Sequence, residues 1–421
     1  MRVPLTIGLD NNFFKFVTLT VFRDITQKSI YKNIWGRMGI MNKNIYLDNA
    51  ATTRMYPEVK EAMLPYMEDK FANSSTNYEE GIENRHVLEG ARKKIADCIG
   101  AKAEEIFFTS GGSESDNWAI KCLAGDNKKK GTHIITQKTE HHAVLNSCEY
   151  LEKLGYDVTY LNVDRDGIVN MEELKSCTES DTTLITIMYG NNEIGTIQPV
   201  NEIGAWARRN GVFFHCDAVA AMGKVPIDVS RIPVDLMSAS GHKFHGPKGV
   251  GFLYVRKGVN IPSFIHGGAQ ERGRRAGTEN LAGIVGMAKA LELSVAKMHE
   301  NVEKEIHLRN YLVERVMREI EDVRYNGSSI YRLPGNASFS FKRVEATALL
   351  VLLEEEGIIA SAGSACNSGS SRLSHVISAI KVPEEYAIGT IRFTLGEDTS
   401  REDIDWTVES LKRNVKLLRM I

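Results

Sequence analysis

One lysine stands among small polar residues at the end of a predicted buried strand. Lys243 ends the run Ser-Ala-Ser-Gly-His-Lys at residues 238–243, between the apolar residues 234–237 and a Gly-Pro-Lys-Gly turn. Burial and nearby cations lower the pKa of an amine, and a neutral amine can attack a carbonyl group. Lys243 is therefore a candidate for Schiff-base formation. A surface lysine in a turn is the alternative interpretation.

A glycine-rich segment follows another predicted strand and opens a helix. Residues 110–115 read Ser-Gly-Gly-Ser-Glu-Ser. Backbone N–H groups at a helix start, unobstructed at Gly112 and joined by the Ser113 hydroxyl, can bind a phosphate group. An N-capping turn is the alternative. The segment matches neither G-x-x-x-x-G-K-[ST] nor G-x-G-x-x-G, which argues against binding of a nucleoside triphosphate or a dinucleotide.

Three further polar side chains follow predicted strands. Asp217 comes after the strand at 212–216, and ligands of open α/β sheets bind at such carboxyl ends. A carboxylate there can keep a pyridine nitrogen protonated, which makes a pyridoxal ring an electron sink. His141 can stack on such a ring and move protons, and Asn192 can reach a ring hydroxyl or a substrate carboxylate. Helix capping is the alternative role for Asp217 and His141.

One cysteine and one arginine stand apart from their surroundings. Cys366 lies in a run of small flexible residues at 361–371, where an accessible thiol becomes a nucleophile if its thiolate is favoured. An incidental loop cysteine is the alternative. Arg392 interrupts an apolar strand and needs a carboxylate partner, either from the chain or from a substrate. The six cysteines show no C-x-x-C pair and no zinc-like spacing, which predicts free thiols in a reducing compartment.

The elements that must position these residues alternate between strand-like and helix-like patterns. This alternation predicts an α/β fold with a doubly wound, mostly parallel sheet. Beyond residue 280 a charged amphipathic helical stretch reaches about residue 323, and shorter elements then predict a smaller α+β C-terminal domain. The predicted strands are 105–109, 133–136, 183–188, 212–216, 234–238 and 251–255, and the predicted helices are 58–69, 79–99, 114–123, 143–154 and 200–210.

The same pattern of elements sets the expected domain boundaries. We expect a large domain at 54–299, a small domain formed by 41–53 with 300–421, and an N-terminal extension at 1–40. The extension carries six basic and two acidic residues and is expected to be a dispensable arm or an upstream translation; a transit peptide is the alternative. A net charge of −2 gives no global field that favours nucleic acid or an anionic membrane as a partner.

Taken together, ordered motifs along the chain resemble the pyridoxal-phosphate-dependent cysteine desulfurases, specifically the group with a long catalytic-cysteine loop. The resemblance covers about residue 42 to the end. The motifs are residues 46–53, 109–114, 140–141, 192–195, 240–243, 267–272, 275–278, 364–366 and 391–393.

The resemblance implies fold type I of the pyridoxal-phosphate enzymes, like aspartate aminotransferase. It implies that Lys243 binds the cofactor aldehyde, that Asp217 pairs with the pyridine nitrogen and that His141 stacks on the ring. The phosphate would be held by residues from three segments, one of them from a partner subunit, which implies a homodimer. These phosphate-binding residues are Gly112, Ser113, Ser240, His242 and, from the partner, Thr278.

The implied reaction removes sulfur from L-cysteine and gives L-alanine with a persulfide on Cys366. Arg392 and Asn192 would hold the substrate carboxylate, and Lys243 and His141 would be the other catalytic residues. The persulfide would pass to a sulfur-acceptor protein such as an iron–sulfur scaffold, in the cytoplasm, with neither nucleic acid nor membrane as a partner.

Two positions depart from the family pattern. Ala220 stands where the family usually has a glutamine that donates to the cofactor hydroxyl, a loss of about 1 kcal/mol. Residues 73–75 read Asn-Ser-Ser where a proline commonly follows the asparagine. Ala220 keeps two alternatives open: another fold type I enzyme, such as a selenocysteine lyase or an aminotransferase, or a catalytically impaired partner in sulfur assembly.

Overall fold

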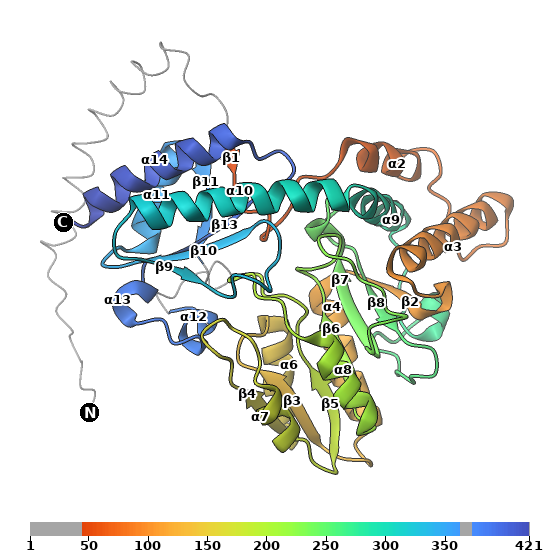
Figure 1. Ribbon diagram of the computed structural model, residues 1–421. Helices are drawn as coiled ribbons and strands as arrows, with labels where there is room; N and C mark the ends of the chain where they lie inside the picture. The colour runs from red at the N-terminus through yellow and green to blue at the C-terminus, as the bar shows by residue number, and fades with distance from the viewer. Residues whose placement is uncertain (1–43, 363–372, 421) are drawn as a thin grey trace, which may run out of the picture. The chain divides into compact units, whose positions relative to one another are not determined.

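The largest sheet of the described chain has seven strands (Figure 1). The computed structural model describes residues 44–362 and 373–420, so Cys366 and residues 1–40 lie outside the described residues. The chain divides into two units, residues 1–45 and 46–421.

The strands of this sheet lie in the order β2-β8-β7-β6-β5-β3-β4. All neighbours pair in parallel except β8, which is antiparallel to both β2 and β7. The predicted doubly wound, mostly parallel sheet is therefore confirmed. The strands are β2 (Ile106–Thr109), β3 (His133–Gln137), β4 (Asp157–Leu161), β5 (Thr182–Thr186), β6 (Phe213–Asp217), β7 (Leu236–Ser240) and β8 (Gly251–Val255).

The sequence analysis did not predict strand β4. It is an edge strand whose first residue is exposed and whose next three are half-buried. Its sequence, Asp-Val-Thr-Tyr-Leu, lacks the continuous apolar run that marks a strand buried on both faces.

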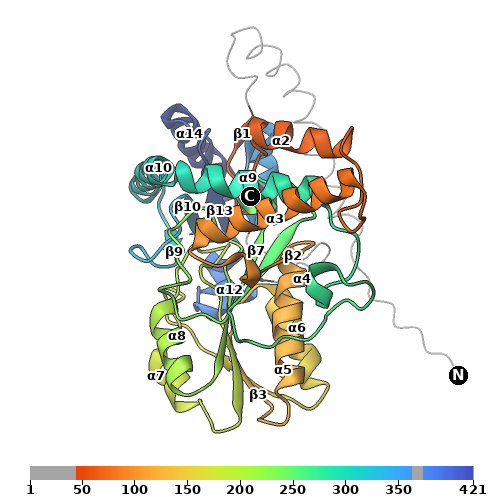
Figure 2. The same ribbon diagram turned by 90° about the vertical axis from the view of Figure 1, so that its right-hand side faces the viewer.

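Helices cover both faces of the sheet, and the side chains of each strand alternate between two cores. In β6 and β7, Phe214, Cys216, Met237 and Ala239 point into the core under α3, α8 and α9. Leu236 points into the opposite core, under α4 and α6. Figure 2 shows α3 and α9 running next to each other. The helices are α2 (Pro57–Met67), α3 (Glu79–Ile99), α4 (Gly112–Asn117), α5 (Leu123–Asp126), α6 (His142–Glu152), α7 (Met171–Ser176), α8 (Val200–Arg209) and α9 (Leu281–Ala296), with 3-10 turns η1 (Ala103–Glu105), η3 (Gly241–Lys243) and η4 (Gln270–Gly273).

The predicted helix at 114–123 is built from three pieces. Helix α4 is followed by a π-helix, η2 (Trp118–Cys122), and then by α5. A π-turn inserts one extra residue, which changes the direction of the side chains that follow. Trp118, Ala119 and Ile120 are all buried here.

The C-terminal part of the chain forms an antiparallel sheet with helices on it, as expected for the smaller α+β part. Its four strands lie in the order β12-β13-β10-β9. The Thr394 amide donates to the Leu47 carbonyl, and the Leu47 amide donates to Ile359, so residues 47–48 lie along this sheet as predicted for an edge segment. The elements are β1 (Ile45–Tyr46), α10 (Met298–Glu319), β9 (Val323–Asn326), β10 (Asn336–Phe341), α11 (Ala346–Glu355), β11 (Ile358–Ile359), β12 (Ser361–Ala362), α12 (His375–Ala379), α13 (Glu384–Ala387), β13 (Thr390–Thr394) and α14 (Arg401–Leu418).

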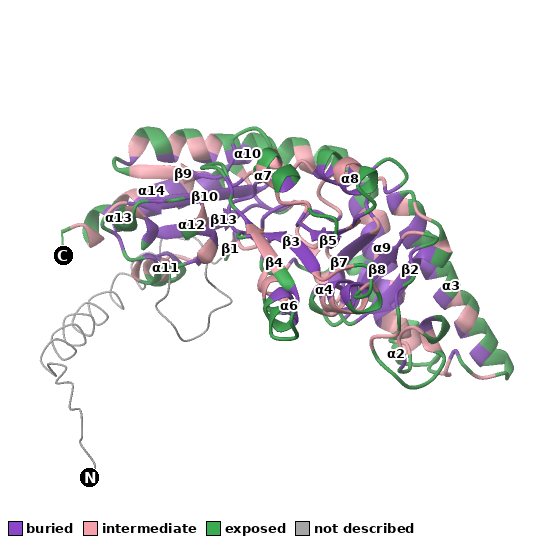
Figure 3. Cartoon of the chain, turned by 90° about the horizontal axis from the view of Figure 1, so that it is seen from below, coloured by how far each residue is buried: buried purple, intermediate pink, exposed green. Residues whose placement is uncertain are grey.

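The strands of both sheets are almost wholly buried, as the purple colouring in Figure 3 shows. Only β4, β6, β9 and the short strands carry residues that are half-buried or exposed. Among the described residues, no helix combines the length and the apolar character needed to cross a membrane.

Candidate active site

Lys243 lies in the 3-10 turn η3, directly after the carboxyl end of β7. Its Nζ donates hydrogen bonds to the carbonyl oxygens of Ala50 at 2.5 Å and Ala51 at 2.9 Å. The lysine is half-buried rather than exposed to bulk solvent, so the surface-lysine alternative is wrong. These two carbonyl oxygens hold the amine at the edge of the sheet.

Asp217 is the last residue of β6 and is only 5% exposed. Its Oδ1 accepts a hydrogen bond from the Val219 N–H at 2.9 Å. Burial raises the pKa of the Asp217 carboxyl, while the positive charges that His141 and Lys243 can carry act in the opposite direction. A protonated ring nitrogen placed against this carboxyl would favour its ionised form, because an opposite charge close by stabilises a carboxylate.

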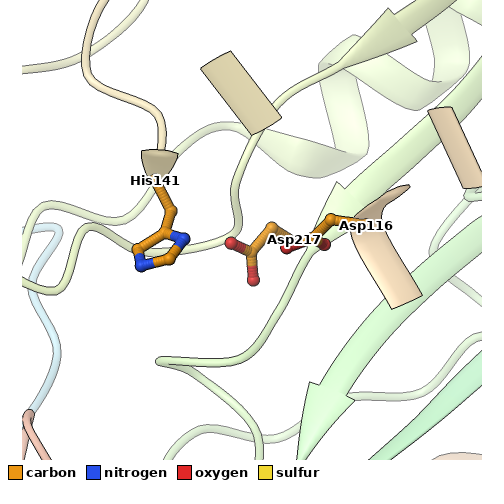
Figure 4. A group of neighbouring side chains, drawn as sticks. All are labelled: Asp116, His141 and Asp217. Atoms are coloured by element: carbon orange, nitrogen blue, oxygen red, sulfur yellow. The ribbon is translucent and has the colours of Figure 1, made fainter. Parts of the chain in front are cut away.

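His141 precedes α6 and caps it. Its Nδ1 accepts the Ala143 N–H at 3.1 Å, so in the neutral ring the proton sits on Nε2. Burial lowers the pKa of His141, which favours this neutral form. The capping alternative is thus confirmed, and the same ring also lies with Asp116 and Asp217 in a group whose nitrogen and oxygen atoms are within 4.8 Å of one another (Figure 4).

The glycine-rich turn lies beside the end of β7. Gly111 has a φ of 151°, and a Cβ built on it would stand 3.5 Å from the Ser240 Oγ. A Cβ on Gly112 would stand only 2.6 Å from Val219 Cγ2, two residues beyond Asp217. The turn therefore needs glycine to pack this closely, and it brings the predicted phosphate-binding residues Gly112 and Ser240 to one place. Ser113 is exposed at the start of α4.

His242 lies between Ser240 and Lys243 in the sequence and contacts the N-terminal motif. Its Nδ1 is 3.2 Å from Thr52 Oγ1. Burial and the nearby lysines lower the pKa of His242 to about 4, so the ring is neutral at physiological pH and its second nitrogen can donate to an anion.

Arg392 is 3% exposed in the middle of β13, and its expected carboxylate partner is internal. Its Nη2 donates to Asp48 Oδ1 at 2.7 Å, and its Nη1 donates to the backbone carbonyl of Asn192 at 3.0 Å. Its Nε finds no hydrogen-bond partner among the described residues. Asn192 thus meets Arg392 through its main chain, and the Arg392 Nε–H is a buried donor with no acceptor among the described residues.

The ends of the segment that contains Cys366 are both held at this site. Before it, Ser361 and Ala362 of β12 pair with Arg392 and Ile391 of β13. After it, the His375 Nε2 bonds the Glu140 carbonyl at 2.9 Å, next to His141. Cys366 itself lies outside the described residues.

The comparisons with known proteins establish the family. Residues 45–406 match the sequence model described as aminotransferase class-V. The cysteine desulfurase IscS of Dictyoglomus turgidum is 51% identical over 381 residues, which are 90% of this chain and 97% of that relative. The chain belongs to the cysteine desulfurases of the class V aminotransferase family.

Other relatives agree with this membership of the cysteine desulfurase family. The cysteine desulfurase IscS of Methanosarcina thermophila is 52% identical over 378 residues, 90% of this chain and 93% of that relative. Among solved structures, a NifS-like protein superposes with a TM-score of 0.83 at 38% identity, covering 90% of this chain and all of that one. A structure titled SspA in complex with cysteine has a TM-score of 0.75 at 37% identity and covers 84% and 99% of the two chains.

Cysteine desulfurases of this family depend on pyridoxal phosphate, which is therefore the cofactor of this chain. The described residues fit that group on three counts. A buried carboxyl, Asp217, can face the pyridine nitrogen; a half-buried amine, Lys243, can meet the aldehyde; and the close approach of Gly111 and Gly112 leaves backbone N–H groups open to the phosphate.

Two further positions of the family's pattern, Thr278 and Ala220, do not belong to this cluster. Thr278 is exposed, and its expected contact is with a second subunit. The neighbouring Arg275 pairs with Glu114 of α4 at 2.8 Å, which fixes the 275–278 segment close to the glycine-rich turn of its own chain. Ala220 is half-buried against the core under α9 and offers no side-chain donor.

Sequence reasoning missed several buried polar residues behind the site. Glu140 accepts hydrogen bonds from the Met188 N–H and from Gln137, both at 2.7 Å, and burial raises its pKa to about 8. Glu193 accepts from the Ser374 hydroxyl at 2.6 Å, and burial raises its pKa to about 7. The signal was available, because each is an acidic residue next to a predicted site residue, but nothing in the sequence showed that either is buried.

Proposed function

We propose that this protein is a cysteine desulfurase that removes sulfur from L-cysteine, releases L-alanine and carries the sulfur as a persulfide on Cys366. One observation supports this most strongly: a lysine, a buried carboxyl and a neutral histidine meet at one sheet edge, beside both ends of the segment that contains the cysteine. A plain aminotransferase has no need of a thiol between two stretches of chain that both contact this site.

Each residue has a defined task in the proposed reaction. When bound, pyridoxal phosphate supplies an electron sink for the negative charge that develops at the substrate Cα. The buried Nε–H of Arg392 binds the substrate carboxylate and orients the amino acid. Lys243 would bind the aldehyde, and its Nζ accepts the proton from the substrate Cα. Asp217 would keep the pyridine nitrogen protonated, and His141 would cover the ring.

The sulfur transfer step is a nucleophilic attack on sulfur. The Cys366 thiolate forms an S–S bond with the substrate sulfur while the substrate Cβ–S bond breaks. The electron pair of the broken bond stays with the carbon skeleton, whose Cβ takes up one proton from solvent. Lys243 returns the other proton to Cα, and the product leaves as alanine. The persulfide sulfur passes to an acceptor protein, for which an iron–sulfur scaffold is our proposal.

We also propose a homodimer in which Thr278 of one subunit completes the phosphate site of the other. The large domain at 54–299 and the small domain at 41–53 with 300–421 remain our proposal for the division of the chain, with the boundary in the first turn of α10. A free thiol at Cys366 needs a reducing compartment, which supports the cytoplasm as the location.

The test uses purified protein loaded with pyridoxal phosphate and mixed with L-cysteine. We expect alanine to form and the mass of the Cys366 peptide to increase by one sulfur atom. Cys366→Ser should abolish persulfide formation, while Cys98→Ser, a half-buried cysteine outside this site, should leave it intact. Failure to produce alanine from cysteine would refute the proposal and leave the impaired sulfur-assembly partner.

A second candidate function is favoured by Ala220, which removes a donor to the cofactor hydroxyl. Under it, the enzyme is a selenocysteine lyase or an aminotransferase of the same fold. Selenide release from selenocysteine, or amino-group transfer to a keto acid, would then persist in Cys366→Ser. If both activities fall with persulfide formation, the second candidate is excluded.

A further inference from the structure

Asp116 lies on α4 directly beside Asp217 and is buried to 1% exposure. Its carboxyl belongs to the group of atoms within 4.8 Å of one another that also contains His141 and Asp217. In Figure 4, Asp217 lies between His141 and Asp116. Two buried carboxyls thus meet where the proposed function uses only one.

The alternation of β6 and β7 puts a polar lining under α4. Phe214 and Cys216 face the core under α9, so His215 and Asp217 face the opposite side, together with Ser238 of β7. His215 is held at both nitrogens: Nδ1 is 2.9 Å from Thr186 Oγ1 and Nε2 is 3.0 Å from Ser238 Oγ.

The donors around the two carboxyls are unequal. Asp217 accepts the Val219 N–H, and both His141 and Lys243 favour its anion. The Oδ1 of Asp116 has no hydrogen-bond partner among the described residues, although His215 Nε2 stands 3.6 Å away. Burial lowers the pKa of His215 to about 3, so this ring is neutral and adds no positive charge beside Asp116.

The charged groups facing Asp116 are all unfavourable to its anion. Burial and the negative charge of Asp217 raise the pKa of Asp116 well above the ordinary range, and Glu140 adds to this only where it is ionised, while the Ser238 hydroxyl acts in the opposite direction. Two buried carboxyls within 4.8 Å of each other titrate as a coupled pair, and one of them then titrates far higher than the other. The unequal donors decide that the proton resides on Asp116 and the charge on Asp217.

We infer that Asp116 is a positioning residue of the cofactor site, a neutral acid whose polar O–H group lies behind Asp217 and leaves Asp217 as the one negative charge facing the pyridine nitrogen. This inference rests on the proposed role of Asp217. An ionised Asp116 would place a second negative charge in the same buried group and make it costly for Asp217 to ionise. An apolar side chain would remove the polar neighbour of the Asp217 carboxylate.

The first measurement determines the protonation state and needs no turnover. An infrared difference spectrum between the cofactor-loaded protein and its Asp116→Asn variant, at neutral pH, should contain a carboxylic-acid C=O stretch that shifts in D2O. A spectrum with carboxylate bands alone would overturn the inference. Because no L-cysteine is added, this result does not depend on whether the desulfurase reaction works.

The second measurement compares binding of pyridoxal phosphate and the pH titration of its visible absorbance band. Asp116→Ala should weaken binding about tenfold, because the Asp217 carboxylate loses a polar neighbour within 4.8 Å, and move the titration. Asp116→Asn should restore both, because an amide is neutral and still a donor. Asn117→Ala, on the same helix and bonded to the Ser113 carbonyl, is the control for damage to α4.

Either of two outcomes would overturn the positioning role. One is that Asp116→Ala, folded by circular dichroism, matches the wild type in affinity and titration. The other is that Asp116→Asn shifts the titration as far as Asp217→Asn does, since a neutral residue cannot lose a charge. If Asp116→Ala does not fold, the infrared spectrum and the Asp116→Asn titration still decide.

Discussion

Arg392 donates a 2.7 Å hydrogen bond to Asp48, a residue 344 positions earlier in the chain. The pair joins the middle of β13 to the start of the described chain, and its two side chains are 4% and 15% exposed. The arginine that we propose as the substrate-binding residue is therefore already oriented by a buried ion pair. The ion pair with Asp48, and not the strand alone, fixes the direction in which the Arg392 Nε–H points.

Removing Asp48 should weaken both stability and substrate binding. Asp48→Asn leaves a buried guanidinium without its counter-charge, and breaking such a pair costs about 3 kcal/mol. We expect this loss in urea unfolding, together with a higher KM for cysteine. A double-mutant cycle with Arg392→Gln should show a double variant less destabilised than the sum of the single ones. Strict additivity would mean that the two side chains do not interact.

A second buried pair should be equally important for the fold. Glu271 of η4 binds the Arg92 guanidinium through both oxygens, at 2.8 and 2.9 Å, and also accepts the Phe108 N–H of β2. Arg92→Met should cost about 3–5 kcal/mol in unfolding free energy, because it leaves a buried carboxylate unpaired.

The next residue on the same helix is the matched control for that pair. Lys93 bonds Asp97, with both side chains more than half exposed. Lys93→Met should cost less than about 1 kcal/mol, since exposed ion pairs contribute little. Equal losses in the two variants would show that burial of the Arg92 pair is not the source of its strength.

The buried Glu140 predicts a pH dependence of stability. Its folded-state pKa of about 8 exceeds the ordinary value of 4.5, so the folded state binds the extra proton between these values. Stability should therefore fall as pH rises through this window, by at most about 1.4 kcal/mol per pH unit. Glu140→Gln keeps the acceptor for the Met188 N–H and removes the titration.

The measurement for Glu140 is thermal or urea unfolding at several pH values between 5 and 8, a range set by the ordinary carboxyl pKa and the folded value of about 8. The stability of Glu140→Gln relative to the wild type should increase with pH. A difference that stays constant over the range would mean that Glu140 is ionised throughout.

Gly112 should tolerate no side chain. Gly112→Ala places a Cβ 2.6 Å from Val219 Cγ2, and such overpacking costs about 1–3 kcal/mol. Because Val219 lies two residues after Asp217, retention of pyridoxal phosphate should fall as well. Gly90→Ala in α3 meets open space and should stabilise the protein by about 0.5–1 kcal/mol. If Gly112→Ala retains pyridoxal phosphate as well as the wild type does, this turn is not part of the phosphate site.

The sequence by itself determined the family, most of the large sheet and a candidate site. Six of the strands in the large sheet follow from continuous apolar runs, because these strands are buried on two faces, and the longer helices follow from helical periodicity, whereas β4 and α7 were missed. Lys243, Asp217, His141 and Gly112 could be found because each follows a strand, and the carboxyl ends of parallel strands meet at one edge.

Only the tertiary structure decided which polar and charged residues contact one another at this sheet edge. That Asp48 is the partner of Arg392, that Asn192 contributes its carbonyl, and that Asp116 lies against Asp217 depend on contacts between residues far apart in the chain. Spacing along the chain carries no information on such contacts. The degree of burial, which sets the protonation of Asp116 and Glu140, arises only when α4 and α6 close over the sheet.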